Sequence, residues 1–190
     1  MEKISMGENE ISFKVDEEAT LVQAAREDPE AFARLYHRYV TPVYRYLYQR
    51  VDSASDAEDL TTQTFIAALE SLVHYREQGR FSAWLFTIAR RKTIAYYRGR
   101  RENLNLEIAR DHSEDQGDLL EAVAHQETLS GISELIAALD EEEKELLRLR
   151  FSAALTYKEI GTLVGRSEPA VKMAIHRLLD RLQAAWEERS

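Results

Sequence analysis

The sequence predicts an all-α protein of two small helical domains joined by an acidic linker, with a helix-turn-helix in the second domain. Its 190 residues include seven glycines and three prolines, and apolar residues recur at helical spacing almost throughout. Residues 76–101 carry eight basic residues and one acidic residue, a net +7, whereas residues 102–145 carry two and fourteen, a net −12. These shifts place the first domain at residues 18–101, the linker at 102–130 and the second domain at 131–187.

Two helices are expected at the start of the first domain. Residues 18–26 form a short one, and Asp28 followed by Pro29 is a typical N-cap and first helical residue for the next. The second helix has an apolar, tyrosine-rich face, with a kink expected at Pro42. The residues of this face are expected to be core, and they are Phe32, Leu35, Tyr36, Tyr39, Val43, Tyr46 and Leu47.

A third helix is expected to open with a capping box formed by Ser55 and Glu58. Its apolar face is made of Leu60, Phe65, Ala68, Leu69 and Leu72. Its other face is polar and consists of Asp56, Asp59, Thr62 and Gln63. Two interpretations stay open: the acidic residues complement the helix dipole, or this face docks onto a basic partner surface.

Aromatic and basic residues are interleaved from residue 75 to residue 101. In proteins that hold single-stranded nucleic acid, aromatic rings stack on unpaired bases while arginine and lysine hold the backbone. Tyr75, beside the polar loop 75–80, is the candidate for stacking. The residues expected in the core are Phe81, Trp84, Leu85 and Ile88. The basic residues are Arg90, Arg91, Lys92, Arg98, Arg100 and Arg101.

The acidic tract from Glu102 to about Thr128 has weak periodicity and separates the two helical regions, which predicts a linker. A short surface helix around Leu119, Leu120 and Val123 is the alternative. After the linker, Asp140 is expected to cap a helix that continues to Arg150. The acidic residues 141–143 in its first turn are expected to complement the dipole and to be solvated.

The helix-turn-helix is predicted between Leu155 and Leu182. Thr156 and Glu159 form a capping box, and Gly165 tolerates the positive φ of a sharp turn. A second helix then starts with Ser167 as its N-cap and Pro169 in its first turn. The stripe to be buried consists of Val171, Ile175, Leu178 and Leu182.

The opposite side of that second helix is suited to duplex DNA. At about 100° per residue, Pro169, Met173, His176 and Arg177 point away from the apolar stripe, with Lys172 and Arg181 on its flanks. An ordinary helical hairpin with solvated basic side chains is the alternative.

Composition argues against several other classes. Without cysteine, no disulfide, thiolate metal site or thiol nucleophile is possible. The five histidines show no metal-ligand spacing, and no nucleotide-binding fingerprint occurs, so we expect neither catalysis nor a metal nor a cofactor. No apolar run approaches the roughly 20 residues that span a bilayer, and the acidic N-terminus is unlike a signal peptide, so a cytoplasmic protein without membrane insertion is expected.

Three stretches, taken in order, resemble the extracytoplasmic-function (ECF) sigma factors of bacteria. They are Asp56-Ala-Glu-Asp-Leu60 followed by Thr64-Phe65, then Trp84-Leu-Phe-Thr-Ile-Ala-Arg90, then the helix-turn-helix. The likeness covers about residues 18–187. It implies a transcription initiation factor that binds core RNA polymerase and recognises the −10 and −35 elements of promoter DNA.

The resemblance also implies roles for particular residues. The residues implied to dock on the clamp helices of the polymerase β′ subunit are Asp56, Glu58, Asp59, Leu60 and Gln63. Those implied to hold the melted −10 region are Tyr75, Arg76, Arg80, Arg90, Arg91 and Arg98, with a flipped base captured by the loop 75–80. Those implied to meet the −35 element are Arg166, Ser167, Lys172, Met173, His176 and Arg177. Further implied contacts are the polymerase β flap and an anti-sigma factor, with the linker threading the polymerase cleft.

Two other functions remain open from the sequence. A helix-turn-helix regulator would bind duplex DNA without docking on core polymerase, and would not need the basic aromatic segment 75–101. A pure protein-interaction module would have no DNA affinity in any complex.

Overall fold

The computed structural model describes residues 17–51, 53–76, 81–106 and 131–189, with side chains described up to residue 100 in the third range. The described residues are mostly helical and include no strand, which confirms the all-α prediction. The chain divides into two compact units at Arg101, and each unit is considered by itself. No helix in the described ranges is long and apolar enough to cross a membrane.

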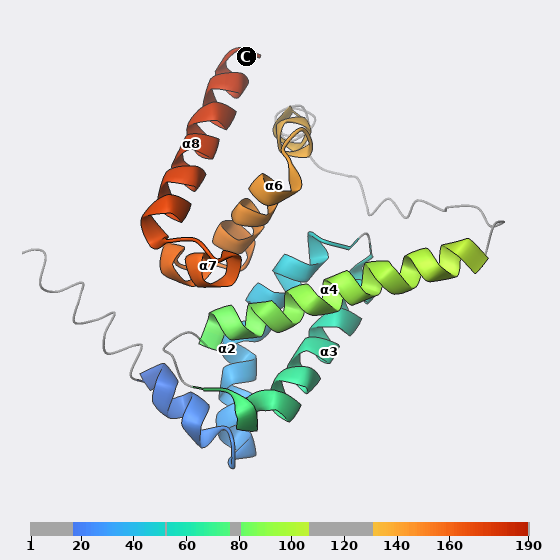
Figure 1. Cartoon of the computed structure of the whole chain (residues 1–190), viewed down its shortest axis with the longest axis vertical. Helices are drawn as coiled ribbons and strands as arrows, with labels where there is room; N and C mark the ends of the chain where they lie inside the picture. Colours follow the sequence, from blue (N-terminus) through green and yellow to red (C-terminus); the bar gives the residue numbers. More distant parts are fainter. Residues whose placement is uncertain (1–16, 52, 77–80, 107–130, 190) are drawn as a thin grey trace, which may run out of the picture. The chain divides into compact units, whose positions relative to one another are not determined.

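The first unit packs three long helices against one another (Figure 1). A short helix over residues 17–24 precedes α2 (Pro29–Tyr48), which is followed by α3 (Ala54–Ser71), a 3-10 turn η1 (Leu72–His74) and α4 (Phe81–Leu106). Its centre is aromatic and aliphatic, and the rings of Tyr46 and Phe86 meet edge to face with centroids 5.4 Å apart. The fully buried large side chains of this unit are Val22, Leu35, Val43, Tyr46, Leu47, Leu72, Phe81, Leu85 and Phe86.

The caps of the first unit agree with the sequence at α2 and differ at α3. The carboxylate of Asp28 accepts from the N–H of Glu30 at 2.9 Å, so α2 begins at Pro29 as expected and runs through Pro42 as one helix. The prediction that Ser55 and Glu58 form a capping box is wrong. Ser53 is the N-cap instead, its hydroxyl accepting from the N–H of Asp56 at 3.3 Å. Two serines two residues apart both qualify as caps, and Ser53 is the one with extended backbone.

The second unit is a set of shorter helices. A helix over residues 131–137 is followed by α6 (Glu141–Leu147), a π-helical turn η2 (Arg148–Ser152), α7 (Tyr157–Val164) and α8 (Glu168–Glu187). Asp140, Thr156 and Ser167 cap α6, α7 and α8, as the sequence predicts. Asp140 also forms a capping box with Glu143, which was not predicted. The expected α-helix through Arg150 is wrong in its last turn. The N–H of Ala153 donates to the carbonyl of Arg148, five residues back, and widens that turn.

Two glycines shape the turn between α7 and α8. Gly165 has φ of 72°, the left-handed conformation expected at this position. Gly161 lies where the chain passes close to α7, because a Cβ there would come within 2.5 Å of the carbonyl oxygen of Arg166. The turn is therefore fixed both by the backbone freedom of one glycine and by the absent side chain of another.

Candidate nucleic-acid interface

The basic side of α8 faces solvent as predicted. Val171, Ile175 and Leu178 are buried, while Lys172, Met173, His176 and Arg177 are exposed. The helical period explains the separation, since residues three or four apart share a face. This face can present two permanent cations and one imidazole to phosphates, and the apolar surface of Met173, which is 52% exposed, to base edges.

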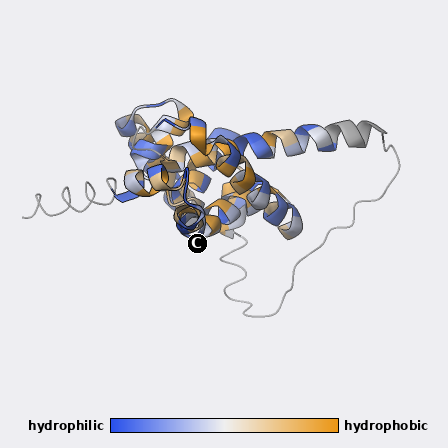
Figure 2. Cartoon of the chain, turned by 90° about the horizontal axis from the view of Figure 1, so that it is seen from below, coloured by the Kyte–Doolittle hydropathy of each residue, from blue (hydrophilic) through white to orange (hydrophobic). Residues whose placement is uncertain are grey.

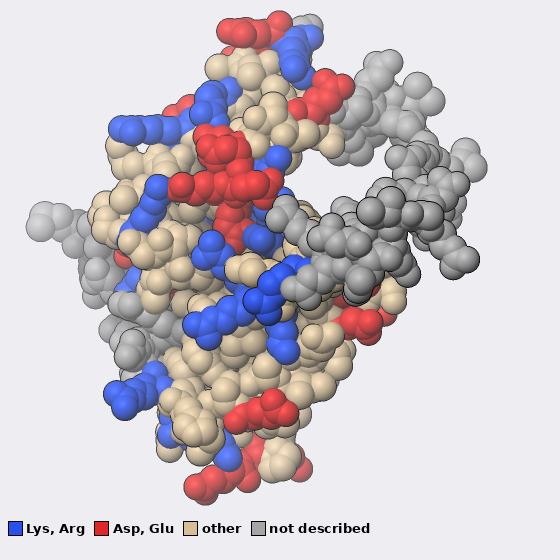
Figure 3. Space-filling view, turned by 45° about the vertical axis from the view of Figure 1, so that its right-hand side comes forward, with Lys and Arg blue, Asp and Glu red and all other residues tan. Residues whose placement is uncertain are grey.

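Acidic side chains at the start of α6 pair with basic residues of the helix-turn-helix. Glu142 pairs with Arg166, and Glu143 pairs with Arg181 at 2.5 Å. Figure 3 shows a cluster of acidic side chains with basic side chains around it. The acidic run 141–143 lies in the first turn of α6, and Glu141 and Glu142 are exposed as expected. The ion pairs to Arg166 and Arg181 are an addition that the sequence did not predict.

Two of the residues implied to meet the −35 element already have intramolecular partners. Arg166 pairs with Glu142, and the hydroxyl of Ser167 accepts from the N–H of Ala170 at 3.4 Å. The pair is open to water, because 43% of the Arg166 side chain and 63% of the Glu142 side chain are exposed. Exposed pairs contribute about 0–1 kcal/mol, so Arg166 can exchange its carboxylate for a phosphate at little cost.

The neighbours of Glu141, the first residue of α6, shift the pKa of its carboxyl. Burial on its own raises the pKa of its carboxyl, but hydrogen bonds from Arg148 and Lys144 outweigh this and lower the pKa overall. Both basic nitrogens lie 3.3 Å from the carboxylate. The start of α6 is thus held by a small network of charges.

In the first unit, α4 carries a basic stripe. Arg90, Arg91, Ile94 and Arg98 recur at helical spacing, and all four are exposed. Figure 3 shows lysine and arginine side chains gathered along this helix. Towards its C-terminal end α4 projects past α2 and α3 (Figure 1), and the coloured part of this projection alternates between hydrophilic and less polar segments (Figure 2). Ile94, 57% exposed, is the apolar member of the stripe and was not singled out from the sequence.

Tyr75 does not present its ring for stacking, which corrects the prediction. The residue is 7% exposed, and its ring packs against Phe81 and Trp84 with centroids 5.8 and 4.8 Å away. Its carbonyl accepts a hydrogen bond from the guanidinium of Arg26. The contact between Tyr75 and Phe81 thus brings together the residues on either side of the segment 76–80. A lone tyrosine beside a polar loop gives no sequence signal for this, because its burial depends on rings that follow the loop.

The structure describes some of the other residues implied for the −10 region and not the rest. Arg76 is exposed at the start of the loop, and the residues of the α4 stripe are described above. Arg80 lies outside the described residues, as does the side chain of Arg101. Phe81 and Leu85 are fully buried, as expected for core, while Trp84 and Ile88 are half-buried.

The polar face of α3 is partly as predicted. Glu58, Asp59 and Gln63 are exposed. Leu60, by contrast, is 4% exposed and belongs to the core, so it is wrong as a direct surface contact. The carboxylate of Asp56 accepts a hydrogen bond from the hydroxyl of Tyr96 at 2.8 Å, so part of its hydrogen-bonding capacity is used within the first unit.

An apolar row continues the exposed face of α3. Ile66 and Leu69 of α3 and Val73 of the following turn η1 are 52%, 53% and 64% exposed, and they follow Gln63 at spacings of three or four residues. The sequence prediction placed Leu69 in the core and did not single out the other two. A polar start followed by an apolar row on one helix face is typical of a protein contact surface.

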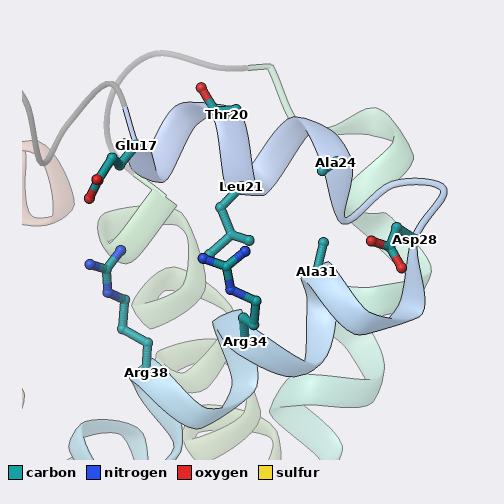
Figure 4. A pocket seen from close by; sticks show the side chains of 8 residues that line it. All are labelled: Glu17, Thr20, Leu21, Ala24, Asp28, Ala31, Arg34 and Arg38. Carbon is teal, nitrogen blue, oxygen red and sulfur yellow. The ribbon is translucent and has the colours of Figure 1, made fainter.

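A groove of about 670 Å³ lies between α2 and the helix over residues 17–24. Figure 4 shows Arg34 and Arg38 rising from α2 on one side, with Glu17 opposite Arg38. Arg38 pairs with Glu18 at 3.6 Å. No group of three histidine, aspartate or glutamate side chains in the described ranges could hold a metal ion.

Comparison with known proteins assigns a family to both units. Sigma-70 region 2 matches residues 35–103, and Sigma-70 region 4 matches residues 135–184. The ECF RNA polymerase sigma factor ShbA of Streptomyces griseus is 31% identical over 189 residues, covering 91% of this chain and 99% of ShbA. YlaC of Bacillus subtilis, an RNA polymerase sigma factor, is 31% identical, covering 75% of this chain and 84% of YlaC. BldN of Streptomyces coelicolor is 32% identical over 158 residues, and this chain spans 60% of its length.

Solved structures give the same fold. CnrH in complex with the cytosolic domain of CnrY superposes with a TM-score of 0.64 at 24% identity, covering 90% of this chain and 98% of CnrH. The sigma factor RpoE of Bartonella quintana, solved with the anti-sigma factor NepR, has a TM-score of 0.59 at 17% identity, covering 82% of this chain and 96% of that one. With both of its units matched to sigma-70 regions and ShbA matched over almost its full length, the chain belongs to the ECF sigma factors of the sigma-70 family.

Proposed function

We propose that this chain binds core RNA polymerase and directs initiation at promoters through two separate DNA contacts. The observation that carries the proposal is that each sigma-70 region presents its own basic helix face, α4 in region 2 and α8 in region 4. A factor of this kind acts in the cytoplasm by binding and needs no catalytic group of its own. The acidic linker 102–130 is proposed to thread the polymerase cleft, where its charge suits a channel built for RNA.

Polymerase docking is assigned to α3 in this proposal. Glu58, Asp59 and Gln63 are exposed together and suit a basic partner such as the β′ clamp helices, with the apolar row Ile66, Leu69 and Val73 extending the contact. Leu60 supports the face from the core. Region 4 is proposed to contact the β flap. The same exposed surfaces are available to an anti-sigma factor, which we propose as a second protein partner.

The two DNA contacts are proposed to differ in kind. The stripe Arg90, Arg91 and Arg98 on α4 is proposed to hold the melted −10 strand beside the loop 76–80. The exposed face of α8 is proposed to enter the major groove at the −35 element, with phosphates held by Lys172, His176 and Arg177.

Reconstitution with purified bacterial core RNA polymerase tests the proposal. We expect the chain to co-elute with core enzyme and to direct transcription from promoter fragments selected with the reconstituted holoenzyme. Asp59→Asn is expected to weaken core binding several-fold, because it removes an exposed charge from the docking face. Glu27→Gln, which removes an exposed carboxylate before α2, is the matched control and should bind normally. Failure of the wild-type chain to bind active core enzyme would overturn the proposal.

A further inference from the structure

A hydrogen-bonded chain of three side chains links the second half of α4 to the first turn of α3. The hydroxyl of Tyr96 donates to the carboxylate of Asp56 at 2.8 Å. The guanidinium of Arg100 donates to the oxygen of the same hydroxyl at 3.0 Å. Tyr96 and Asp56 are 40 positions apart in the sequence, so the bond between them is a tertiary contact.

This chain lies where the apolar packing of α4 ends. The buried residues of the helix are Phe81, Ser82, Ala83, Leu85, Phe86, Ala89 and Thr93. From Ile94 to Arg100, every described side chain is exposed or half-buried. In this stretch the hydroxyls of Tyr96 and Tyr97 reach other elements, since Tyr97 donates to the carbonyl of Arg50. In residues 94–100, hydrogen bonds rather than apolar packing therefore fix the direction of α4.

Tyr96 and the basic stripe lie on opposite sides of α4. At about 100° per residue, Tyr96 is about 200° away from Arg98 around the helix axis. The bond to Asp56 therefore holds this segment of α4 by the face opposite to the one that carries Arg98. A tilt or rotation at this point would move the arginine stripe relative to α3.

The other end of the bond lies on the helix proposed to dock on polymerase. Asp56 is in the first turn of α3, close in sequence to the exposed Glu58 and Asp59. Burial, followed by the hydrogen bond to Asp56, raises the pKa of Tyr96, so its hydroxyl stays protonated and remains a donor at neutral pH. Hydrogen bonds to an ionised carboxylate are among the stronger ones in proteins.

We propose that Tyr96 is a positioning residue that fixes the DNA-facing stripe of α4 relative to the polymerase-facing side of α3, through its bond to Asp56. This inference rests on the proposed function. It gives Asp56 a different role from its exposed neighbours, because its carboxylate orients α4 from within the unit rather than contacting polymerase directly.

The test compares Tyr96→Phe with Tyr48→Phe in reconstituted holoenzyme. Both changes remove one hydroxyl, but Tyr48 is 52% exposed and its hydroxyl has no hydrogen-bond partner in the described part of the chain. Promoter opening is measured with a fluorescent base analogue in the −10 element. We expect Tyr96→Phe to slow promoter opening roughly tenfold. The midpoint of thermal unfolding should stay close to that of wild type, and the affinity for core enzyme should stay within about twofold. Tyr48→Phe should behave as wild type throughout.

A double-mutant cycle with Asp56→Ala assigns the effect to the bond. If the two side chains act as a unit, Tyr96→Phe combined with Asp56→Ala opens the promoter no more slowly than the slower single variant. Asp56→Asn keeps an acceptor oxygen and should retain wild-type affinity for core enzyme.

Three results would overturn the inference while leaving the proposed function intact: normal opening by Tyr96→Phe, additive effects in the cycle, or equal losses in stability, core binding and opening. A wild-type chain that fails to bind core enzyme would instead remove the proposed function.

Discussion

The two basic helices, α4 and α8, present similar chemistry to solvent but are held in place by different forces. Aromatic rings and tyrosine hydroxyls hold α4 within region 2, with contacts such as Tyr46 to Phe86 and Tyr96 to Asp56. An aliphatic stripe, a tight glycine turn and exposed ion pairs to α6 hold α8 within region 4. Exposed ion pairs weaken as salt rises, whereas packed rings and partly buried hydroxyls do not. Salt should therefore affect the surroundings of α8 far more than those of α4.

The largest expected effect concerns the glycine turn that positions α8. Gly161→Ala should lower the free energy of unfolding by about 1–3 kcal/mol, since the added methyl would clash with the backbone at Arg166. Gly99→Ala in α4 is the matched control. A Cβ there has no neighbour within 4 Å, so the change should stabilise the helix by up to about 1 kcal/mol. Urea unfolding of the full chain measures both. Equal effects of the two changes would show that the turn is not held as described.

The next effect concerns the DNA contact of α8. Replacing Lys172 and Arg177 together with alanine should weaken holoenzyme binding to upstream duplex DNA by roughly tenfold at 0.1 M salt. The slope of log affinity against log salt should fall in magnitude by about 1.8, because two phosphate contacts are lost. Replacing Arg34 and Arg45, two exposed arginines of α2, is the control. An unchanged slope would remove the two residues from the proposed contact.

A smaller effect on DNA affinity is expected from the ion pair between Glu142 of α6 and Arg166 of the turn. Glu142→Gln should raise affinity for upstream duplex by about twofold to threefold at low salt, because Arg166 is released and a charge that repels phosphate is lost. The gain should disappear as salt is raised. Glu188→Gln removes an exposed carboxylate beyond α8 and serves as control. Lower affinity in Glu142→Gln would mean that the pair positions Arg166 for DNA instead of competing with it.

The smallest effect is the pH dependence contributed by Glu141. Its folded pKa is lowered from 4.5, so its contribution to stability is fully present above that value and is lost as pH falls through the folded pKa. Glu141→Gln should lower stability at pH 7 by less than about 1 kcal/mol, since the carboxylate is exposed. The difference from wild type should vanish in acid. Thermal unfolding across pH 3–7 measures the difference in stability between the two proteins. If that difference grows in acid, the folded pKa of Glu141 is not lowered as described.

Local chemistry made much of region 4 predictable from the sequence. The caps at Asp140, Thr156 and Ser167 and the positive φ of Gly165 each depend on residues within one turn, and all were confirmed. The widened turn at Arg148–Ser152 was missed. Apolar spacing alone does not distinguish it from an α-helical ending.

In region 2, two of the errors came from contacts between distant residues and one from a local ambiguity. The burial of Tyr75 depends on rings that follow the loop, and the hydrogen bond of Asp56 depends on a tyrosine 40 residues away. The cap of α3 was misplaced because Ser53 and Ser55 offer the same chemistry. The charged and polar residues on the exposed faces of α3 and α4 were predicted. The exposed apolar residues beside them and the internal contacts that orient those faces were not.

The central claim is that the two basic helices make separate DNA contacts within one holoenzyme. Fluorescence anisotropy with two probes tests it most directly: a duplex carrying the −35 element and a single strand carrying the −10 element. Replacing Arg91 and Arg98 with alanine should weaken binding of the single strand and leave the duplex bound, and replacing Lys172 and Arg177 should do the reverse. Equal weakening of both probes by either pair of changes would contradict the claim.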